Sequence, residues 1–260
     1  MREDLLGNFL ARAQSEVDVG EVGGETPGQW AAGVPIQLDR GPFTFVRHEY
    51  LRTPYGDDHP CQVEMKCTQM GNTVRALLRV LHLALFRPGV VGAMYLFPSK
   101  TGSGDFSRSR VSPLVEANPQ ALGRYLRDTD SVGLKRVKGK NLIFRGTRSE
   151  EGLRSDPVDI VVYDEFDLFP EGVEGKASKR LSHSDFKWQH YLSNPTIPDY
   201  GIDRLFATTD QQFWMLQCPK CKQYTCLEDH VDRTGKEPPA CLVEWNGEVV
   251  RLCMSCRDAV

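Results

Sequence analysis

Two short segments, about ninety residues apart, carry side chains whose types and spacing suit phosphate chemistry. Residues 66–73 read Lys-Cys-Thr-Gln-Met-Gly-Asn-Thr, and residues 160–166 read Ile-Val-Val-Tyr-Asp-Glu-Phe. In the first segment a glycine turn leads into a helical pattern. Backbone N–H groups at such a helix start point at an anion, and the hydroxyl of Thr73 would be a ligand for Mg²⁺. The first segment therefore predicts a phosphate-binding loop.

This loop departs from the usual pattern at its lysine. The pattern ends in Gly-Lys-Ser/Thr, whereas this chain has Gly71, Asn72 and Thr73. Lys66 stands five residues before Gly71, where the pattern would have its first glycine, and its long side chain could swing across the loop. We expect Lys66 to replace the missing lysine.

The second segment places two carboxylates at the end of a strand pattern. The apolar run before them is typical of a buried parallel strand. Ligands bind outside the carboxyl ends of strands in an open α/β sheet, so Asp164 and Glu165 should face the same crevice as Thr73. We expect Asp164 to hold Mg²⁺, through water, and Glu165 to orient and deprotonate the water that attacks the γ-phosphate.

Each segment alone has an ordinary structural explanation. The first could be a plain strand-to-helix turn, and the second an acidic pair in a helix-capping turn. Both segments in this order favour a nucleoside triphosphatase core that uses ATP and Mg²⁺.

Four cysteines near the end of the chain have the spacing of a metal site. Cys218 pairs with Cys221 and Cys253 with Cys256 as two C-x-x-C motifs, which 31 residues separate. Four thiolates complete a closed tetrahedral Zn²⁺ site with no open catalytic position. We expect this zinc site to be structural.

Two further cysteines, Cys226 and Cys241, lie between the pairs. They could be spare or alternative ligands, although buried apolar thiols are the better interpretation. No signal peptide is visible, and eight cysteines in 260 residues do not make a small disulfide scaffold. A reducing compartment fits the sequence better.

The formal net charge of −3 gives no overall attraction to nucleic acid, and no apolar run approaches membrane-spanning length. A local stretch is nevertheless basic and carries Arg124, Arg127, Lys135, Arg136, Lys138, Lys140, Arg145 and Arg148. It could contact DNA phosphates or supply an arginine to a neighbouring subunit, although a solvated face is more common. No partners at ligand spacing accompany the histidines, and we assign no chemistry to His82, His183 and His190.

The elements that must position these groups alternate between strand and helix patterns. We expect an α/β fold, with a mostly parallel sheet flanked by helices and a small C-terminal zinc-binding module. Strands are expected at 61–66, 91–97, 141–145 and 158–163, and helices at 74–86 and 113–126.

Composition divides the chain into three parts. Residues 1–40 are expected to form an N-terminal arm or linker, with a possible helix from Glu3 to Glu16. Residues 41–212 would form the ATPase domain, and residues 213–260 a zinc-ribbon-like module.

These motifs, in this order, resemble the GpA-type large terminase subunit of tailed bacteriophages, from about Gly41 to the chain end. In that family's variant phosphate loop a lysine can precede the glycine, which supports Lys66. The resemblance implies an ASCE-type P-loop NTPase in which Lys66, Gln69, Gly71, Asn72 and Thr73 bind the nucleotide. The catalytic pair would be Lys66 and Glu165.

Two further segments contribute to the resemblance. Phe144 to Ser149 is similar to the family's approach to its Walker B strand, whose acidic residues match Asp164 and Glu165, and Asp167 completes the Asp-Glu-x-Asp pattern. Residues 193–196 resemble the motif that couples hydrolysis to movement, and this motif would comprise Ser193, Asn194, Pro195 and Thr196.

The implied activity is ATP-driven translocation of double-stranded DNA into a procapsid. The implied partners are the DNA, a small terminase subunit, the portal of the procapsid and further copies of the chain. The implied place is the cytoplasm of the infected bacterial host, without a membrane. The family continues into a nuclease domain, whereas this sequence stops four residues after Cys256, so we expect a fragment without endonuclease activity.

Two other functions remain open. A helicase-like ATP-driven remodeller of nucleic acid would share the fold and require a second helicase-type domain. A non-catalytic, zinc-stabilised DNA-binding or assembly module would explain Asn72 as the mark of an inactive nucleotide site.

Overall fold

A computed structural model describes residues 26–128, 131–148, 153, 156–227, 230 and 240–259. The described residues form two compact units, which divide between Thr209 and Asp210. The first unit carries the phosphate-loop and carboxylate segments, and the second carries the two C-x-x-C pairs. The expected helix from Glu3 to Glu16 lies outside the described residues.

A sheet organises the first unit. Seven strands belong to it in the described part of the chain, in the order β3-β9-β8-β4-β7-β6-β5. The first five run parallel, and β6 and β5 are antiparallel at one edge. Their bounds are β3 Cys61–Met65, β4 Gly92–Phe97, β5 Leu126–Asp128, β6 Leu134–Val137, β7 Lys140–Gly146, β8 Ile160–Asp164 and β9 Trp188–Ser193. The predicted α/β class with a mostly parallel sheet is confirmed.

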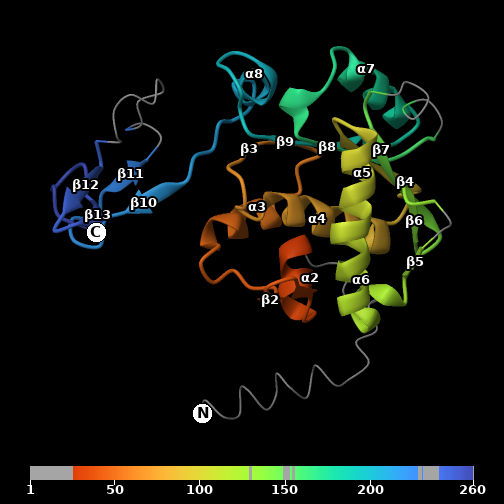
Figure 1. Cartoon of the computed structure of the whole chain (residues 1–260), viewed down its shortest axis with the longest axis horizontal. Coiled ribbons are helices and arrows are strands. Elements are labelled where there is room, and N and C mark those ends of the chain that lie inside the picture. The colour runs from red at the N-terminus through yellow and green to blue at the C-terminus, as the bar shows by residue number, and fades with distance from the viewer. Residues whose placement is uncertain are drawn as a thin grey trace, which may run out of the picture. The chain divides into compact units, whose positions relative to one another are not determined.

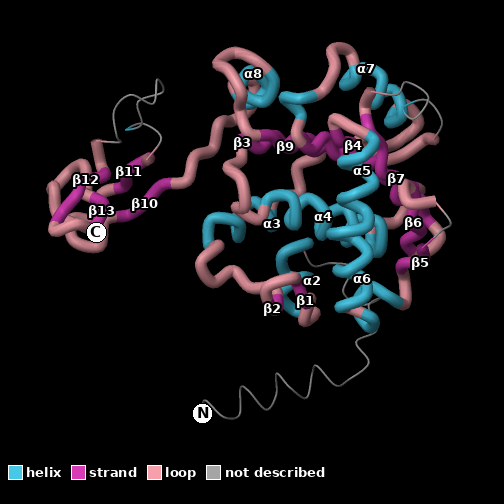
Figure 2. The backbone as a smooth tube through the Cα atoms, in the orientation of Figure 1, coloured by secondary structure: helices cyan, strands magenta, loops and turns pink. Residues whose placement is uncertain are grey.

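Short and long helices connect these strands (Figure 2). The α-helices are α2 Pro27–Gly33, α3 Arg52–Gly56, α4 Asn72–Phe86, α5 Lys100–Phe106, α6 Ser112–Ala117, α7 Val173–Ser178 and α8 Gly201–Phe206. Single turns of 3₁₀-helix occupy Glu49–Leu51, Phe166–Leu168 and Lys179–Leu181, and π-helical segments occupy Ser107–Val111 and Pro119–Gly123. A two-residue hairpin pairs β1 Gln37–Leu38 with β2 Gly41–Pro42.

The central strands are buried on both faces. Tyr95 and Val162 pack with α4 and α2 on one face, whereas Met94 and Tyr163 pack with α7 and α8 on the other. Figure 1 shows α2 and α4 on one side of the sheet and α7 and α8 on the other. Because successive side chains of a strand point to opposite faces, both faces of an apolar strand can fill a core.

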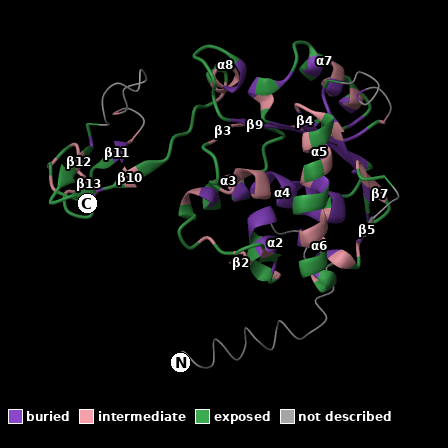
Figure 3. Ribbon diagram, in the orientation of Figure 1, coloured by how far each residue is buried: buried purple, intermediate pink, exposed green. Residues whose placement is uncertain are grey.

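Helix α4 forms where the leucine spacing predicts a helix, and it begins two residues earlier than the pattern indicated. Every residue from Arg75 to Leu85 is buried, and Figure 3 shows the helix buried over most of its length. A helix that is covered on all sides belongs inside a domain. Its position fixes the phosphate loop, which enters it directly.

Part of the stretch that was expected to be an arm or linker is packed into the first unit. Trp30 of α2 and Ile36 are fully buried in the core beside α4. Thr26 caps α2 with a capping box, because its side chain accepts from the N–H of Gln29 and its own N–H donates to the side chain of Gln29. Sequence analysis missed α2 because the segment is rich in glycine. The helix packs on the core through the buried Trp30.

The expected helix at 113–126 differs from the structure. α6 ends at Ala117, a π-helical segment follows, and the chain enters β5 at Leu126. The break falls before Pro119, because the residue that precedes a proline avoids the helical region.

The second unit consists of two antiparallel hairpins in its described part. β10 Met215–Gln217 pairs with β11 Tyr224–Cys226, and β12 Leu242–Trp245 pairs with β13 Glu248–Arg251. None of the helices in the described ranges is long and apolar enough to cross a membrane.

Candidate active site and metal centre

The loop between β3 and α4 is held at both ends. Gly71 has a φ of 82°, a left-handed conformation that glycine adopts without strain, so the chain turns sharply into α4. The hydroxyl of Tyr50 donates to the carbonyl of Met70 at 2.7 Å. The N–H of Lys66 donates to the carbonyl of Ser193 at 2.9 Å, which ties the loop to the end of β9.

The side chain of Lys66 joins the two segments that sequence analysis singled out. Its Nζ donates to Thr73 Oγ1 at 2.9 Å and to Asp164 Oδ1 at 2.6 Å. The predicted Mg²⁺ ligands therefore lie around one cationic atom. A hydroxyl and a carboxylate that already enclose a positive charge are the kind of oxygen donors that Mg²⁺ takes.

Asp164 is buried, and its second carboxylate oxygen is also bound. Tyr95 of β4 donates its hydroxyl to Asp164 Oδ2 at 3.0 Å, and the N–H of Glu165 donates to Oδ1 at 3.1 Å. Burial and the neighbouring carboxylate raise the pKa of Tyr95 well above its ordinary value, so it stays a donor. Sequence analysis missed Tyr95, which an apolar strand pattern does not distinguish from a core residue.

Glu165 leaves the sheet in an unusual backbone conformation. Its φ is 61°, and its side chain is exposed beside the buried Asp164. A non-glycine residue in the left-handed region holds strain that surrounding contacts must maintain. This backbone conformation turns the two adjacent carboxyl groups to different environments. Asp164 is buried at the end of β8, and Glu165 is exposed to solvent.

Asn72 occupies the position of the missing lysine and contacts β3. Its Nδ2 donates to Glu64 Oε2 at 2.7 Å. Gln69, which was also expected in the nucleotide site, is exposed with a φ of 61°. Of the five residues expected to bind nucleotide, Lys66 and Thr73 are in direct contact with each other.

Glu64 is the centre of a buried polar cluster that sequence analysis did not identify. Arg75 of α4 forms an ion pair with Glu64, and His190 Nε2 lies 2.6 Å from Glu64 Oε1. Arg75 also donates to the side chain of Gln62 and, at 2.6 Å, to the carbonyl of Pro54. Burial lowers the pKa of Arg75 to about 9. This cluster joins α4 to β3 and β9 directly behind the phosphate loop.

Asp167 connects the carboxylate strand to residues 193–196. Its carboxylate accepts hydrogen bonds from the N–H and the hydroxyl of Thr196, both at 2.9 Å, and from the N–H of Ile202 at 2.7 Å. Its own N–H donates to Ser193 Oγ at 3.2 Å. A Cβ atom at Gly201 would lie 2.4 Å from Asp167 Oδ1, so only glycine fits there. Asn194 and Pro195 of this segment are exposed.

The basic stretch does not form one surface in the structure. It runs through β5, β6 and β7, and three of its side chains make separate contacts. Lys135 is buried and donates to Ser112 Oγ at 2.9 Å, whereas Lys140 donates to the carbonyl of Ala84 at 2.6 Å. Arg145 donates to the carbonyls of Gly133 and Phe144.

The four C-x-x-C cysteines come together in the second unit. Their Sγ atoms all lie within 4.8 Å of one another, with Cys218 3.9 Å from Cys256 and Cys221 3.6 Å from Cys253. A tetrahedral Zn²⁺ with Zn–S bonds of about 2.3 Å separates its sulfur atoms by about 3.8 Å. The measured separations fit such an ion.

Local hydrogen bonds favour the thiolate form at two of these cysteines. The backbone N–H of Cys221 lowers the pKa of Cys218, and that of Cys256 lowers the pKa of Cys253 to about 6. Cys226 and Cys241 are buried and do not belong to the cluster found among the described residues, in agreement with their expected role as apolar thiols.

Comparison of the sequence with protein families gives one match across most of the chain. The family model described as "Phage terminase large subunit gpA, ATPase domain" matches residues 58–259. No curated protein matches the chain significantly.

Comparison with solved structures finds large terminases from phages of thermophiles. The ATPase domain of the Thermus phage P74-26 large terminase has 22% sequence identity and a TM-score of 0.41, with 55% of this chain and 62% of that chain covered. The large terminase of another thermophilic bacteriophage has 15% identity and a TM-score of 0.41, with 56% and 36% covered. The same terminase in complex with ADP has 15% identity and a TM-score of 0.34, with 52% and 32% covered. This chain therefore spans less than two thirds of the length of each of these structures.

Proposed function

Because the chain belongs to the family of phage terminase large subunit gpA ATPase domains, we propose that it hydrolyses ATP to drive double-stranded DNA into a procapsid. The observation that carries the proposal is the position of Lys66 Nζ between Thr73 and Asp164. A phosphate-loop cation, a hydroxyl and a strand-end carboxylate meet there, and phosphoryl transfer requires these groups together. Sheet order supports the ASCE type, since β9 lies between β3 and β8.

In the proposed mechanism, Lys66 turns from Asp164 to the phosphates of ATP. The backbone of the loop that ends in Gly71 and Asn72, and the side chain of Gln69, complete the nucleotide contacts. Mg²⁺, held by Thr73 and Asp164, would neutralise charge on the phosphates. Tyr95 stays protonated, because its pKa is raised well above the ordinary value, and its hydroxyl holds the second oxygen of Asp164.

Glu165 is the proposed general base. Its exposed carboxylate orients the attacking water and takes a proton from it as the water oxygen bonds to the γ-phosphorus. The bond from the γ-phosphorus to the bridging oxygen breaks in the same step, and ADP leaves. The left-handed backbone of Glu165 keeps this side chain out of the sheet edge while Asp164 stays inside it. In this class of reaction, most of the catalysis comes from positioning the reacting groups and from electrostatic stabilisation of the transition state.

Movement would be coupled to hydrolysis through Asp167. A shift of the carboxylate strand end changes three hydrogen bonds to Thr196 and Ile202 at once. Ser193 connects the same segment to the backbone of Lys66. Residues 193–196 therefore contact both halves of the site, as a coupling motif requires.

The remaining roles belong to the whole assembly. We propose a structural Zn²⁺ on Cys218, Cys221, Cys253 and Cys256. We also propose oligomeric assembly with a small terminase subunit at the portal of a procapsid, in the cytoplasm of an infected bacterium. No endonuclease activity is proposed for this sequence.

ATP hydrolysis by the purified chain, with and without double-stranded DNA, tests the proposal. Lys66→Ala and Glu165→Gln should each lower turnover at least about 100-fold, since each removes a group required for phosphoryl transfer. Lys179→Ala and Glu171→Gln are matched controls, because both residues are exposed outside the site. Turnover that survives Glu165→Gln rejects the assigned base, and DNA binding without affinity for Mg²⁺ and ATP supports a binding-only module.

A further inference from the structure

A groove beside the candidate nucleotide site has no role in the mechanism above. It has a volume of about 740 Å³ and lies between α5 and the carboxyl end of β7. Figure 1 shows α5 beside β4 and β7. Its lining residues are Lys100, Thr101, Ser103, Gly104, Asp105, Arg108, Ser131, Val132, Gly133, Phe144, Arg145 and Gly146. We propose that this groove binds the phosphate backbone of double-stranded DNA.

The charge of the groove suits a polyanion. Lys100, Arg108 and Arg145 line it with a single carboxylate, Asp105. Lys100 and Arg108 are exposed and take part in no ion pair within the part of the chain that the structure describes, whereas the nearby Arg110 pairs with Asp39. Two cations thus project into the groove while a third nearby cation is already neutralised.

Hydrogen bonds from a side chain to the backbone, and close approaches of the backbone, fix the wall of the groove. The Nη1 atom of Arg145 donates to the carbonyls of Gly133 and Phe144, at 3.0 and 3.1 Å, so its guanidinium is held in place. A Cβ at Gly146 would lie 2.2 Å from the backbone N atom of Lys100, so glycine at this position permits the close approach of β7 to the start of α5. A Cβ at Gly133 would lie 2.6 Å from Arg145 Nη1 and 3.0 Å from the carbonyl oxygen of Phe144.

Phosphate contacts of DNA come largely from arginine, lysine and hydroxyl side chains, which read no base sequence. Lys100, Arg108, Arg145 and the exposed Thr101 provide these groups in one place. A packaging motor must hold DNA of any sequence, so contacts to the backbone fit the proposed function, on which this inference rests.

The groove also has a short physical connection to the nucleotide site. Phe106, at the end of α5, stacks on Tyr95 with ring centres 5.0 Å apart, and the hydroxyl of Tyr95 donates to Asp164. The side chains of Phe106 and Tyr95 therefore connect α5 to Asp164, the proposed Mg²⁺ ligand. A ligand on α5 lies where it can affect the carboxylate strand.

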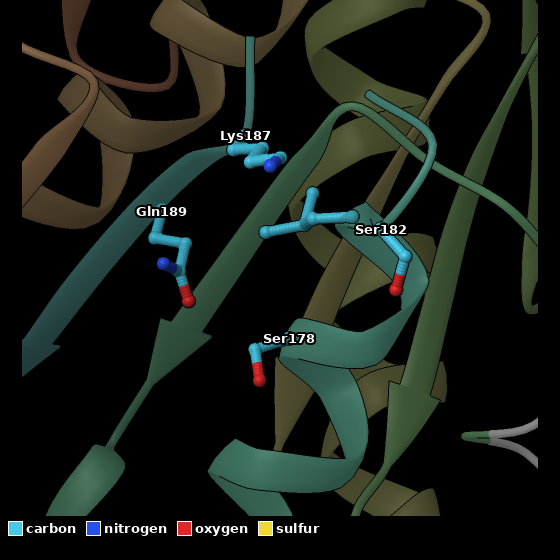
Figure 4. A pocket seen from close by; sticks show the side chains of 5 residues that line it. Ser178, Ser182, Lys187 and Gln189 are labelled. Atoms are coloured by element: carbon cyan, nitrogen blue, oxygen red, sulfur yellow. The ribbon is translucent and has the colours of Figure 1, made fainter. Parts of the chain in front are cut away.

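A smaller hollow provides a matched control surface. It has a volume of about 230 Å³ and is lined by Ser178, Leu181, Ser182, Lys187 and Gln189 (Figure 4). It lies at the amino end of β9, whereas the groove lies at the carboxyl ends of β4 and β7. The exposed Lys187 is therefore a lysine in a hollow at the amino ends of the parallel strands of the same sheet.

The test compares the wild-type chain with the double variant Lys100→Gln/Arg108→Gln and with Lys187→Gln. Binding of a fluorescent duplex of mixed sequence is measured by anisotropy at several salt concentrations. The double variant should bind about tenfold or more weakly, and its slope of log K against log salt should be smaller by about 2, because each lost phosphate contact removes about 0.9. Lys187→Gln should behave as wild type.

Basal ATP hydrolysis and thermal unfolding are measured in parallel on the same proteins. The double variant should keep both at wild-type values, since neither residue contacts the nucleotide site. An unchanged affinity and salt slope in the double variant, or no binding of the duplex by the wild-type chain, overturns the inference. A wild-type chain without ATP hydrolysis whose DNA binding still depends on Lys100 and Arg108 would reject the proposed function and keep the groove.

Discussion

At the scale of single residues, Lys66 has two sets of partners. It contacts Thr73 and Asp164 in this structure, and it would contact phosphates when ATP is bound. Its ammonium group and Mg²⁺ therefore compete for the same two oxygen ligands. The arrangement keeps the buried Asp164 paired when no nucleotide is present, which avoids the large free-energy penalty of an unpaired buried charge.

This competition predicts that Lys66→Ala lets Mg²⁺ alone stabilise the protein. Without the ammonium, Asp164 and Thr73 are available to the cation, and binding to the folded state at 100 times its Kd adds about 2.7 kcal/mol to the free energy of unfolding. The measurement is the Tm of wild type, Lys66→Ala and the control Lys179→Ala during a Mg²⁺ titration without nucleotide. An equal response in the three chains would contradict the competition.

His190 predicts a pH effect from the cluster behind the phosphate loop. Burial lowers the pKa of His190 well below its ordinary value, and the guanidinium groups of Arg75 and Arg79 add to this effect. A histidine whose pKa is lower in the folded state takes up its proton first in the unfolded state. Its contribution to stability is therefore complete above the unfolded pKa of about 6.5 and is lost as the pH falls below it.

The measurement is the free energy of unfolding between pH 7.5 and 5 for wild type and His190→Gln. Wild type should lose stability more steeply below pH 6.5, by at most about 1.4 kcal/mol per pH unit for this one group. Parallel curves for the two proteins would show that His190 does not titrate on unfolding. Replacing the exposed His183 with glutamine is the control.

At the scale of elements, Asp167 holds three segments together. It lies in the 3₁₀ turn that follows β8, accepts two hydrogen bonds from Thr196 and caps the start of α8 through Ile202. The three groups around this buried carboxyl all donate to its oxygen atoms. An amide at this position would present its NH₂ group to at least one of these donors.

Asp167→Asn should accordingly lower the free energy of unfolding by about 1.5–3 kcal/mol, the range for hydrogen bonds to a charged group. It should also reduce DNA stimulation of ATP hydrolysis more than basal hydrolysis, since Thr196, which loses hydrogen bonds, belongs to the coupling segment. Chemical denaturation and ATPase rates measure the two effects. Asp185→Asn, at an exposed position, should leave both at wild-type values.

At the scale of the whole molecule, the two units have different sources of stability. The first has apolar cores on both faces of its sheet. The described part of the second has short hairpins and exposes the large side chains of Tyr224, Trp245 and Val249. A small unit with little core depends on a metal or another cross-link for its fold.

Removal of zinc should therefore unfold the second unit and leave the sheet of the first intact. Cys253→Ser, which removes one thiolate, should have the same effect as a zinc chelator, because the folding free energy of such modules is largely metal-binding free energy. Zinc content by mass spectrometry and thermal unfolding by circular dichroism measure this. Cys61→Ser is the control, since this exposed thiol lies outside the cysteine cluster. A single cooperative transition unaffected by the metal would contradict the prediction.

Local patterns in the sequence determined the fold class and part of the secondary structure. Strand and helix patterns are short-range properties of the sequence, so they predict β3, β4, β7, β8 and α4 without any tertiary contact. The C-x-x-C spacing likewise defines each half of the cysteine cluster within four residues. The order of the motifs was sufficient to indicate the terminase family that the comparison identifies.

Only the tertiary structure decided which of these groups meet. Strand order brings Lys66 to Asp164 and places Tyr95 of β4 against the same carboxylate. The groove of α5 and β7 likewise forms from segments about forty residues apart in the sequence. Periodicity reports the face of an element on which a residue lies, but not the element that packs against that face. That choice depends on closing long loops and filling a shared core, which no short window of sequence contains.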